Sequence, residues 1–592
     1  MEHTETTGFE SNEFIDRLPK HLKQFIKPQN YEDYTPINQA VWRYVMRKNA
    51  DYLSKVAHES YMEGLEKTGV EIDKIPNLYG MNRILKEIGW AAVAVDGFIP
   101  PNAFMEFQAY KVLVIASDIR QLEHIEYTPS PDIIHESAGH APIIANPDYA
   151  EYLRRLGAVG AKAILSKYDM DLYEAVRKLS ILKEAEGISE AQIEEAEQEV
   201  AKLQEMEVQL SEMAEIRNLQ WWTVEYGLVG SMEDPKIYGA GLLSSIGESK
   251  WCMSEEVKKI PYSLDAAKQK FNITKPQPQL YVTPDFAHLM EVLEEFSNTL
   301  SVRKGGSSGI QKLVDSRMVG TIELSSGLQV SGNFAKVITD ANGEVIFYKT
   351  DGATCLATRD KELIGHGIKA HADGFSSPLG KLRNTTILLE DLNPTDFKKH
   401  FLSTNNHVVF EFESGIQVSG TYVTDIRNIY GKLIVIQLKD CTVTYGEQLL
   451  FMPEYGVFDM AVGNQITSAY AGAADCTSFP NVYGPSQTLT IKPEKTESSK
   501  QLEKLYGRVR ELRNTHDINE AELVRIFETL QTNYSNEWLL CLEIYELATD
   551  EALLEKVYTH LQILKKKSTK IALLIHEGLA LLPDKNLWNH LS

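Results

Sequence analysis

The most informative stretch of the chain is TPSPDIIHESAGHAP, residues 128–142. It contains the pattern H-E-x-x-x-H, formed by His135, Glu136 and His140. Zinc hydrolases use the shorter H-E-x-x-H, whose spacing places both imidazoles on one face of a helix. With one more residue the rings would lie about 140° apart on a continuous α-helix, against about 40° for the shorter pattern. We therefore expect the helix to end near Gly139, so that the two rings can converge.

A third metal ligand is needed beside the two histidines, and the segment WWTVEYGL, residues 221–228, contains the best candidate. Glu225 lies there among aromatic and β-branched residues, so we expect it to be buried. A buried carboxylate must be paired, protonated or bound to a metal. Two histidines with one carboxylate are the ligands of non-haem iron(II) oxygenases, which keep positions open for oxygen and substrate. From these residues alone, a zinc hydrolase and a salt-bridged core glutamate both stay open as alternatives.

Composition excludes several other functions. The chain has 592 residues with 83 acidic and 60 basic side chains, a formal net charge of −23. Without a basic block, it is not expected to bind nucleic acid or an anionic membrane. Five widely spaced cysteines predict neither a disulfide framework nor a metal knuckle, and favour a reducing cytoplasm. We see no signal peptide and no apolar run of about 18 residues, so a cytoplasmic protein without a membrane span is expected.

Changes of pattern along the chain predict a multidomain protein, at about 100–200 residues per domain. Residues 1–305 are expected to form a mainly α unit, with an acidic helical insertion over about 160–215. The Gly/Ser-rich residues 303–309 are interpreted as a linker. Residues 313–483 alternate apolar and polar residues as strands do, and residues 501–592 are predicted to be an all-α C-terminal region.

Two finer patterns lie inside these regions. In the insertion, Ser189 begins a capping box, and apolar residues with heptad-like spacing continue to Leu210, so an antiparallel helical pair is expected. In the β-rich region, SGLQVSG at 326–332 recurs as SGIQVSG at 414–420, an offset of 88 residues, which predicts two tandem repeats. We recognise no metal or nucleophile cluster in residues 313–592, so assembly or regulation is expected there.

Three separated motifs together resemble one enzyme family. TPSPDIIHESAGHAP, WWTVEYGL and IYGAGLLSSIGE (residues 237–248) are similar, in order and content, to the tetrahydropterin-dependent aromatic amino acid hydroxylases. The resemblance covers about residues 25–303 and implies a mainly helical catalytic domain with one mononuclear iron(II). It further implies that iron and a tetrahydropterin cosubstrate activate O2 and that L-phenylalanine is hydroxylated to L-tyrosine. Tyrosine or tryptophan hydroxylation is the alternative within the family.

The resemblance also implies residues for the metal and the pterin. The implied iron ligands are His135, His140 and Glu225. Glu136 would act beside the reacting centre, contacting the pterin through water, and Phe104 would stack on the pterin ring with Ile99 beside it. An aromatic face suits a planar bicyclic cofactor. Gln220 stands where the family commonly has tyrosine, which is a departure on the pterin side.

The substrate contacts follow from the same resemblance. Arg120 would pair with the substrate carboxylate, because its planar fork suits two parallel hydrogen bonds. Asp132 would orient Arg120, and Thr128 and Ser244 would contact the amino acid backbone. Trp221 would form an aromatic wall of the pocket.

Substrate choice and architecture give two further expectations. Ile273 aligns approximately with a pocket position that is apolar in the phenylalanine-specific members, and an apolar lining favours the ring without a hydroxyl. A fragment ending near Gly306 would contain every implied site residue and is expected to fold and hydroxylate phenylalanine. The regions after it are candidates for forming a homo-oligomer.

Overall fold

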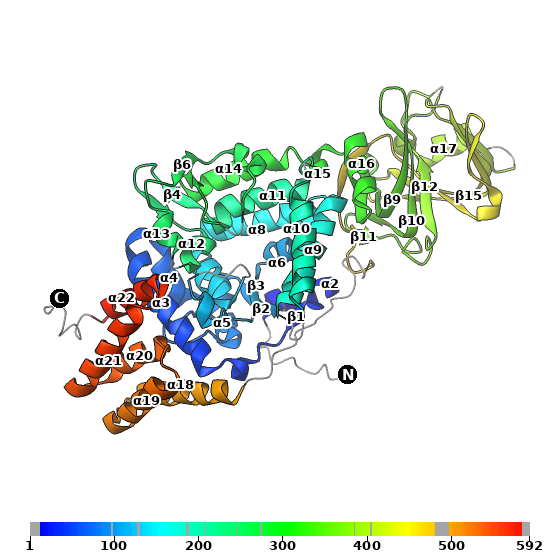
Figure 1. The fold of residues 1–592 in the computed structure, drawn as a ribbon. Helices are drawn as coiled ribbons and strands as arrows, with labels where there is room; N and C mark the ends of the chain where they lie inside the picture. Colours follow the sequence, from blue (N-terminus) through cyan, green and yellow to red (C-terminus); the bar gives the residue numbers. More distant parts are fainter. Residues whose placement is uncertain are drawn as a thin grey trace.

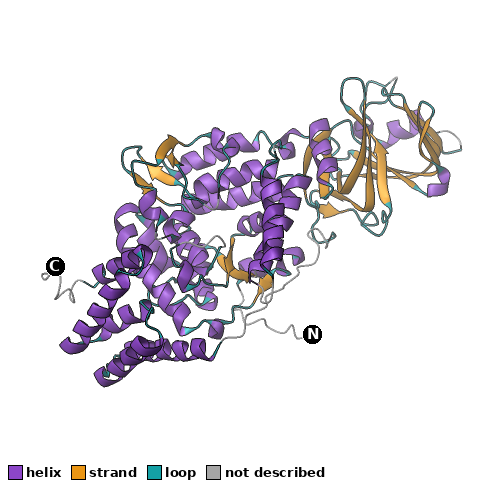
Figure 2. Ribbon diagram, in the orientation of Figure 1, coloured by secondary structure: helices purple, strands orange, loops and turns teal. Residues whose placement is uncertain are grey.

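The computed structural model describes residues 12–95, 99–126, 131–184, 189–206, 208–245, 247–272, 275–383, 385–402, 405–479 and 496–582. A mainly helical unit is followed by a β-rich region and by a set of C-terminal helices (Figures 1 and 2). The β-rich region stands at one end of the molecule, whereas the C-terminal helices lie beside the first helices of the helical unit. This sequence of helical, β-rich and helical regions is the one expected from the pattern of residues. None of the described helices is long and apolar enough to cross a membrane.

The helical unit carries most of the helices and two small sheets. Its helices are α1 (Glu13–Asp16), α2 (Lys20–Lys23), α3 (Pro36–Val56), α4 (Ser60–Lys67), α5 (Leu78–Leu85), α6 (Pro101–Ala109), α7 (Ala141–Ile143), α8 (Pro147–Lys162), α9 (Lys167–Glu184), α10 (Glu190–Gln204), α11 (Glu212–Gln220), α12 (Ala240–Ser244), α13 (Glu248–Trp251), α14 (Phe286–Ser297), α15 (Ser301–Lys304) and α16 (Gly306–Ser316). One sheet has the order β1-β2-β3, with bounds Ile26–Lys27, Ala91–Val95 and Val112–Ala116. The other has the order β5-β4-β7-β6, with bounds Pro235–Ile237, Leu228–Gly230, Gln279–Thr283 and Lys258–Pro261.

The C-terminal helices complete the core of the helical unit. They are α18 (Glu497–Thr515), α19 (Glu520–Asn533), α20 (Leu539–Leu547), α21 (Glu551–Lys565) and α22 (Thr569–Ala580). Their buried side chains join those of α3 in one continuous hydrophobic cluster. Tyr44 donates a hydrogen bond to the Leu574 carbonyl at 2.7 Å, and Arg43 pairs with Glu543 at 2.9 Å. One face of α3 is therefore covered by the end of the chain.

The β-rich region consists of two sheets built in the same order. The first pairs as β11-β10-β9-β8-β18, with β12 also on β10; the second pairs as β13-β14-β15-β16, with β17 also on β15. The first sheet's strands are β8 (Val319–Leu324), β9 (Gln329–Thr339), β10 (Val345–Thr358), β11 (Lys361–Glu362), β12 (Gly374–Pro378) and β18 (Ile466–Ala471). The second sheet's strands are β13 (His407–Glu411), β14 (Ile416–Arg427), β15 (Leu433–Tyr445), β16 (Gln448–Phe451) and β17 (Phe458–Ala461), preceded by α17 (Pro394–Phe401). The tandem repeat itself stays a prediction.

The expected Gly/Ser linker at residues 303–309 is wrong. These residues fall in α15 and α16, apart from Gly305, whose φ of +57° is a conformation that glycine adopts without strain. A side chain at Gly305 would collide with the backbone of Ile466 on β18. Ile310 and Leu313 on α16 are buried in the core of the first β sheet. Packing against β18 thus overrides the flexible composition and fixes the β-rich region to the helical unit.

The acidic insertion forms the expected helical pair. Tyr168 on α9 donates to the Leu203 carbonyl on α10 at 2.9 Å, which joins opposite ends of the two antiparallel helices. Ser189 caps α10 together with Gln192, as its capping box predicts. The predicted apolar seam reaching Leu210 is wrong, because α10 ends at Gln204.

A buried histidine joins the N-terminal helices to the end of the β-rich region. His21 on α2 lies with Nε2 2.8 Å from Glu106 Oε2 on α6, and it also contacts Cys476, which follows β18. Burial alone would lower the pKa of His21, but the contacts with Cys476 and Glu106 outweigh it and raise that pKa to about 9. Cys476 is unpaired, as are the other four cysteines, so the expectation of no disulfide agrees with the structure.

Candidate functional site

The two histidines of the H-E-x-x-x-H stretch lie on a π-helix, η4 (His135–His140), which continues directly into α7. The Ala141 N–H donates to the Glu136 carbonyl, five residues earlier. In this wider turn, residues five apart lie nearly above one another, so His135 and His140 point in the same direction. The expected helix end at Gly139 is therefore wrong, since a change in the width of the turn brings the rings together instead.

Glu225 ends a second π-helix, η5 (Trp221–Glu225), where the Tyr226 N–H donates to the Trp221 carbonyl at 2.9 Å. A glycine in η4 allows α12 to approach closely. A Cβ atom at Gly139 would lie 2.6 Å from the Ala240 carbonyl oxygen, so only glycine permits this approach of α12 to η4. Isolated π-turns occur frequently at functional sites, and here they place the predicted ligands.

Three side chains from the two π-helices converge. His135 Nε2 lies 3.1 Å from His140 Nε2, and the two oxygens of Glu225 lie 3.3 Å from one histidine each. Ligand atoms about 2.1 Å from a metal ion and at right angles to one another lie about 3.0 Å apart. The observed separations fit three adjacent positions around one ion, which leaves the opposite side free.

Glu136 lies at the edge of this cluster. Its Oε2 is 3.8 Å from His140 Nε2, and together with the two histidines it forms an alternative set able to hold a metal ion. The set with Glu225 is the tighter one, because both of its carboxylate oxygens face a histidine at 3.3 Å. Its distances are the ones expected if Glu225 is the third ligand, as the sequence predicts.

The two glutamates have opposite electrostatic settings. Burial would raise the pKa of Glu225, but His140 and His135 outweigh it and hold that pKa well below its ordinary value. Burial raises the pKa of Glu136 to about 8; His140 opposes this shift, whereas Glu225 and Asp132 add to it. Glu225 therefore favours its anionic form, whereas Glu136 favours its protonated form.

Hydrogen bonds around His135 fix which of its nitrogens faces the cluster. His135 Nδ1 lies 3.0 Å from Ser244 Oγ, and that hydroxyl donates to the Ala240 carbonyl at 2.7 Å. The hydroxyl must then accept the Nδ1 proton, which leaves the lone pair of Nε2 pointing at Glu225 and His140. Ser244, expected to contact the substrate, thus orients His135, one of the predicted metal ligands.

Arg120 and Asp132 form a buried bidentate pair. Arg120 Nε and Nη2 each donate to one oxygen of Asp132 at 2.8 Å, and Nη1 donates to the Ser244 carbonyl at 3.4 Å. Asp132 also accepts from the His135 backbone N–H at 3.0 Å, so it connects Arg120 to η4. Burial would raise the pKa of Asp132, but Arg120 outweighs it and the pKa is lowered. Within the described residues, two of the five guanidinium donors stay available.

The remaining predicted site residues are more dispersed. Phe104 on α6 and Ile99 before it are half-buried and pack against the same hydrophobic cluster. Trp221 stacks on Phe271 with ring centroids 4.1 Å apart, and its buried indole N–H has no acceptor among the described residues. Two predicted substrate-side residues, Thr128 and Ile273, lie outside the described residues.

The sequence reasoning missed an acid next to the cluster. Glu248 on α13 accepts a hydrogen bond from the Tyr226 hydroxyl at 2.7 Å. Burial raises the pKa of Glu248 to about 7, although Tyr226 and the nearby His135 oppose that shift. Glu248 closes the motif IYGAGLLSSIGE, which was a signal for its position. Gln220, the departure noted above, is buried at the end of α11.

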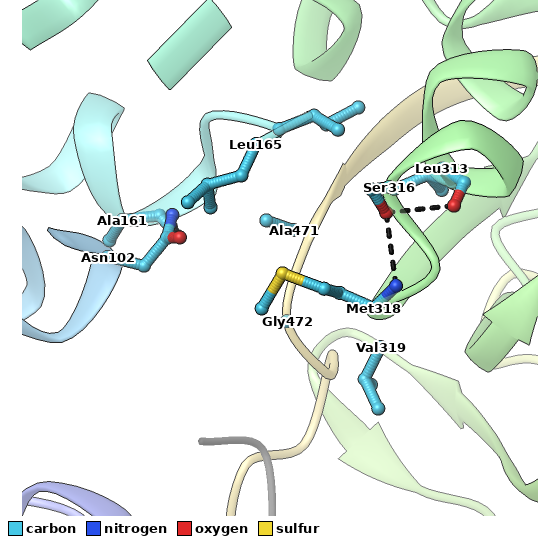
Figure 3. Close-up of a pocket in the computed structure, with 10 residues that line it drawn as sticks. Asn102, Ala161, Leu165, Leu313, Ser316, Met318, Val319, Ala471 and Gly472 are labelled. Atoms are coloured by element: carbon cyan, nitrogen blue, oxygen red, sulfur yellow. Dashed lines mark hydrogen bonds between the residues drawn. The ribbon is translucent and has the colours of Figure 1, made fainter. Parts of the chain in front are cut away.

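A small enclosed cavity lies away from this cluster (Figure 3). It holds about 20 Å³, room for about one water molecule, at the contact between the helical unit and the β-rich region. Asn102 and Leu165 face it from one side, and Ser316, Met318 and Ala471 from the other. It is a packing gap and offers no chemistry.

The chain is similar to several known proteins. Residues 8–170 and 182–304 match the family described as biopterin-dependent aromatic amino acid hydroxylase. Phenylalanine-4-hydroxylase of Chromobacterium violaceum is 27% identical over 286 residues, covering 46% of this chain and 82% of the relative. The Pseudomonas aeruginosa enzyme of the same name is 28% identical over 264 residues, covering 44% of this chain and 84% of the relative. A solved structure of Chromobacterium violaceum phenylalanine hydroxylase with iron(III) and 7,8-dihydrobiopterin has 23% identity and a TM-score of 0.38. The match covers 50% of this chain and 93% of that one.

The helical unit belongs to the biopterin-dependent aromatic amino acid hydroxylase family. The protein is thus an enzyme of the pterin-dependent aromatic amino acid monooxygenase class, with relatives named phenylalanine-4-hydroxylase. This confirms the resemblance drawn from the three sequence motifs. The match lies on the helical unit, so the β-rich region and the C-terminal helices are additions to the family's catalytic domain.

Proposed function

We propose that this protein is a phenylalanine 4-monooxygenase, converting L-phenylalanine and O2 to L-tyrosine with a tetrahydropterin as cosubstrate. The observation that carries the proposal is the convergence of His135 Nε2, His140 Nε2 and the Glu225 carboxylate at 3.1–3.3 Å. Two imidazoles and one carboxylate suit iron(II) and keep open positions on the metal.

The chain's own groups prepare this centre. Iron(II) together with a tetrahydropterin would supply the activation of dioxygen. Ser244 holds His135 in the tautomer whose Nε2 can ligate, and Glu225 contributes the negative charge. Glu136, buried with a raised pKa, would hold a proton beside the centre. Because the cluster is buried, it also keeps water away from the reacting atoms.

Substrate and pterin would bind on opposite sides of this constellation. Arg120 is held by Asp132 along one edge of its guanidinium, so its other edge can bind the substrate carboxylate. We place Thr128, Ser244 and Trp221 on the substrate side, as the family resemblance implies. The proposed pterin-side residues are Phe104, Ile99 and Glu136.

Phenylalanine is the proposed substrate because several relatives are named phenylalanine-4-hydroxylase. The family resemblance also implies an apolar substrate pocket. Hydroxylation of tyrosine or tryptophan is the first alternative. A zinc hydrolase using H-E-x-x-x-H is the second and less favoured alternative.

The proposal extends to the rest of the chain. We place the catalytic domain in residues 1–305, two β repeats in 313–483 and a helical domain in 501–592, and we propose self-association through the later regions. The matching strand orders around β10 and β15 support the repeat. The five free cysteines support a cytoplasmic location.

Product analysis tests the proposal. The full chain, supplied with iron(II) and a tetrahydropterin, should convert phenylalanine to tyrosine faster than it hydroxylates tyrosine or tryptophan. Glu225→Gln, which keeps size but removes the charged ligand, should produce no tyrosine. Faster hydroxylation of tryptophan would overturn the substrate, and pterin-independent hydrolysis with zinc would overturn the reaction.

A further inference from the structure

A second group of two histidines and a carboxylate lies in the β-rich region, far along the chain from the catalytic cluster. His366 Nδ1 is 3.1 Å from Asp459 Oδ2, and His371 Nε2 is 3.5 Å from the same oxygen. All three ligand atoms lie within 4.8 Å of one another. The expectation that residues 313–592 hold no metal cluster is therefore wrong.

The two histidines sit on a short loop between β11 and β12 that is fastened to β10. The His366 carbonyl accepts from the Leu356 N–H at 2.9 Å, and the His371 carbonyl accepts from the Thr354 N–H at 3.0 Å. Between them the chain makes one tight turn, in which the Ala370 N–H donates to the Gly367 carbonyl. Both backbones are thus positioned by a central strand, so the direction of the two side chains does not depend on a free loop.

Asp459 comes from the other sheet and is itself oriented. It lies on β17, directly opposite Gln437 on β15. The Gln437 side-chain amide donates to Asp459 Oδ1 at 3.0 Å, which leaves Oδ2 to face the histidines. Outer hydrogen bonds of this kind orient the ligating carboxylates of metal sites.

The polar atoms of this cluster are buried but poorly satisfied. The side chains of His366, His371 and Asp459 are 9%, 11% and 11% exposed. Neither His366 Nδ1 nor His371 Nε2 makes a hydrogen bond of acceptable geometry within the described residues, although both face the carboxylate. Buried polar atoms without partners are rare and point to a missing ion or water. One cation among the three atoms would satisfy all of them.

We propose that His366, His371 and Asp459 bind a divalent transition-metal ion of the zinc class, with water as the fourth ligand. Ligands at about 2.0–2.2 Å in a tetrahedron lie about 3.3–3.6 Å apart, which is close to the two separations from Asp459. Imidazole and carboxylate ligands suit zinc, and no thiolate is required. The ion would fasten the loop of the first β sheet to β17 of the second. It would therefore stabilise the contact between the two sheets.

Zinc stoichiometry of the full chain tests the site. Protein stripped with a chelator and dialysed against micromolar zinc should bind two equivalents, because the catalytic ligand set also accepts zinc. His366→Ala and Asp459→Asn should each bind one equivalent of zinc, at the catalytic ligand set. His140→Ala should also bind one equivalent, at the site of His366, His371 and Asp459. The double variant of His366 and His140 should bind none. His400→Ala, which removes an exposed histidine from α17 in the same region, is the matched control and should still bind two.

A structural readout excludes misfolding as the cause. Asp459→Asn keeps the shape of the side chain, and its circular dichroism should match that of the unaltered chain. In crystals grown with zinc, anomalous scattering should show an ion bonded to His366, His371 and Asp459. Two equivalents retained by folded His366→Ala, or a single equivalent in the unaltered chain that His140→Ala abolishes, would overturn the proposal.

Discussion

Replacing Arg120 with lysine separates substrate binding from the rest of the site. Lysine keeps the positive charge that Asp132 needs, so the buried pair is not left as a lone carboxylate. It lacks the second edge of the guanidinium fork, which is where the substrate carboxylate would bind. Each hydrogen bond to a charged group is worth about 1.5–3 kcal/mol, so losing one should raise the KM for phenylalanine by roughly 10- to 150-fold.

Steady-state kinetics of tyrosine formation measures this effect, with phenylalanine and the pterin varied in turn. The KM for the pterin should change less than about threefold, because Arg120 is assigned to the substrate side. Arg154→Lys is the matched control, since Arg154 is partly exposed on α8 and pairs only with Glu151 among the described residues. An unchanged KM for phenylalanine, or an equal rise for the pterin, would refute the assignment.

Three further predictions concern stability and packing. Gly139→Ala places a Cβ 2.6 Å from the Ala240 carbonyl, so it should destabilise the fold by about 1–3 kcal/mol and lower iron content, measured by chemical denaturation and metal analysis. The pKa of His21 is raised from 6.5 to about 9. Protonated His21 should therefore add up to about 3 kcal/mol to the free energy of unfolding, fully below pH 6.5 and progressively less as the pH rises to 9. His21→Gln should remove this pH dependence from the measured stability. The expectation that a fragment ending near Gly306 folds and is active on its own conflicts with the observed core, because residues 496–582 cover one face of α3. Such a fragment should instead aggregate in size-exclusion chromatography; a monodisperse, active fragment would contradict this.

The residues of the metal cluster could be found from the sequence, but not the turn that joins them. His135, His140 and Glu225 stood out because their types and order match a ligand set and a family. A spacing of five residues does not by itself distinguish a helix that ends from a helix that widens. The structure shows the widened turn, with Ala240 packed closely against Gly139.

Packing also explains the other departures. Glycine and serine at residues 303–309 predict a flexible linker, yet contacts with β18 fold them into helices. His366 and Asp459 are far apart in the chain and meet only through the pairing of strands. The sequence predicts the C-terminal helices, but their amphipathic pattern does not indicate that they pack against α3.

Iron content and tyrosine formation, measured together on the unaltered chain and on Glu225→Gln, test the central claim most directly. Even the loss of an outer partner of a ligand lowers metal affinity about 10- to 100-fold, so loss of the ligand itself should lower it by more. We predict that the unaltered chain binds iron(II) and forms tyrosine only when a pterin is supplied. A folded Glu225→Gln protein should have lost both the bound iron and the tyrosine formation. Normal iron content with normal turnover in Glu225→Gln would contradict the account.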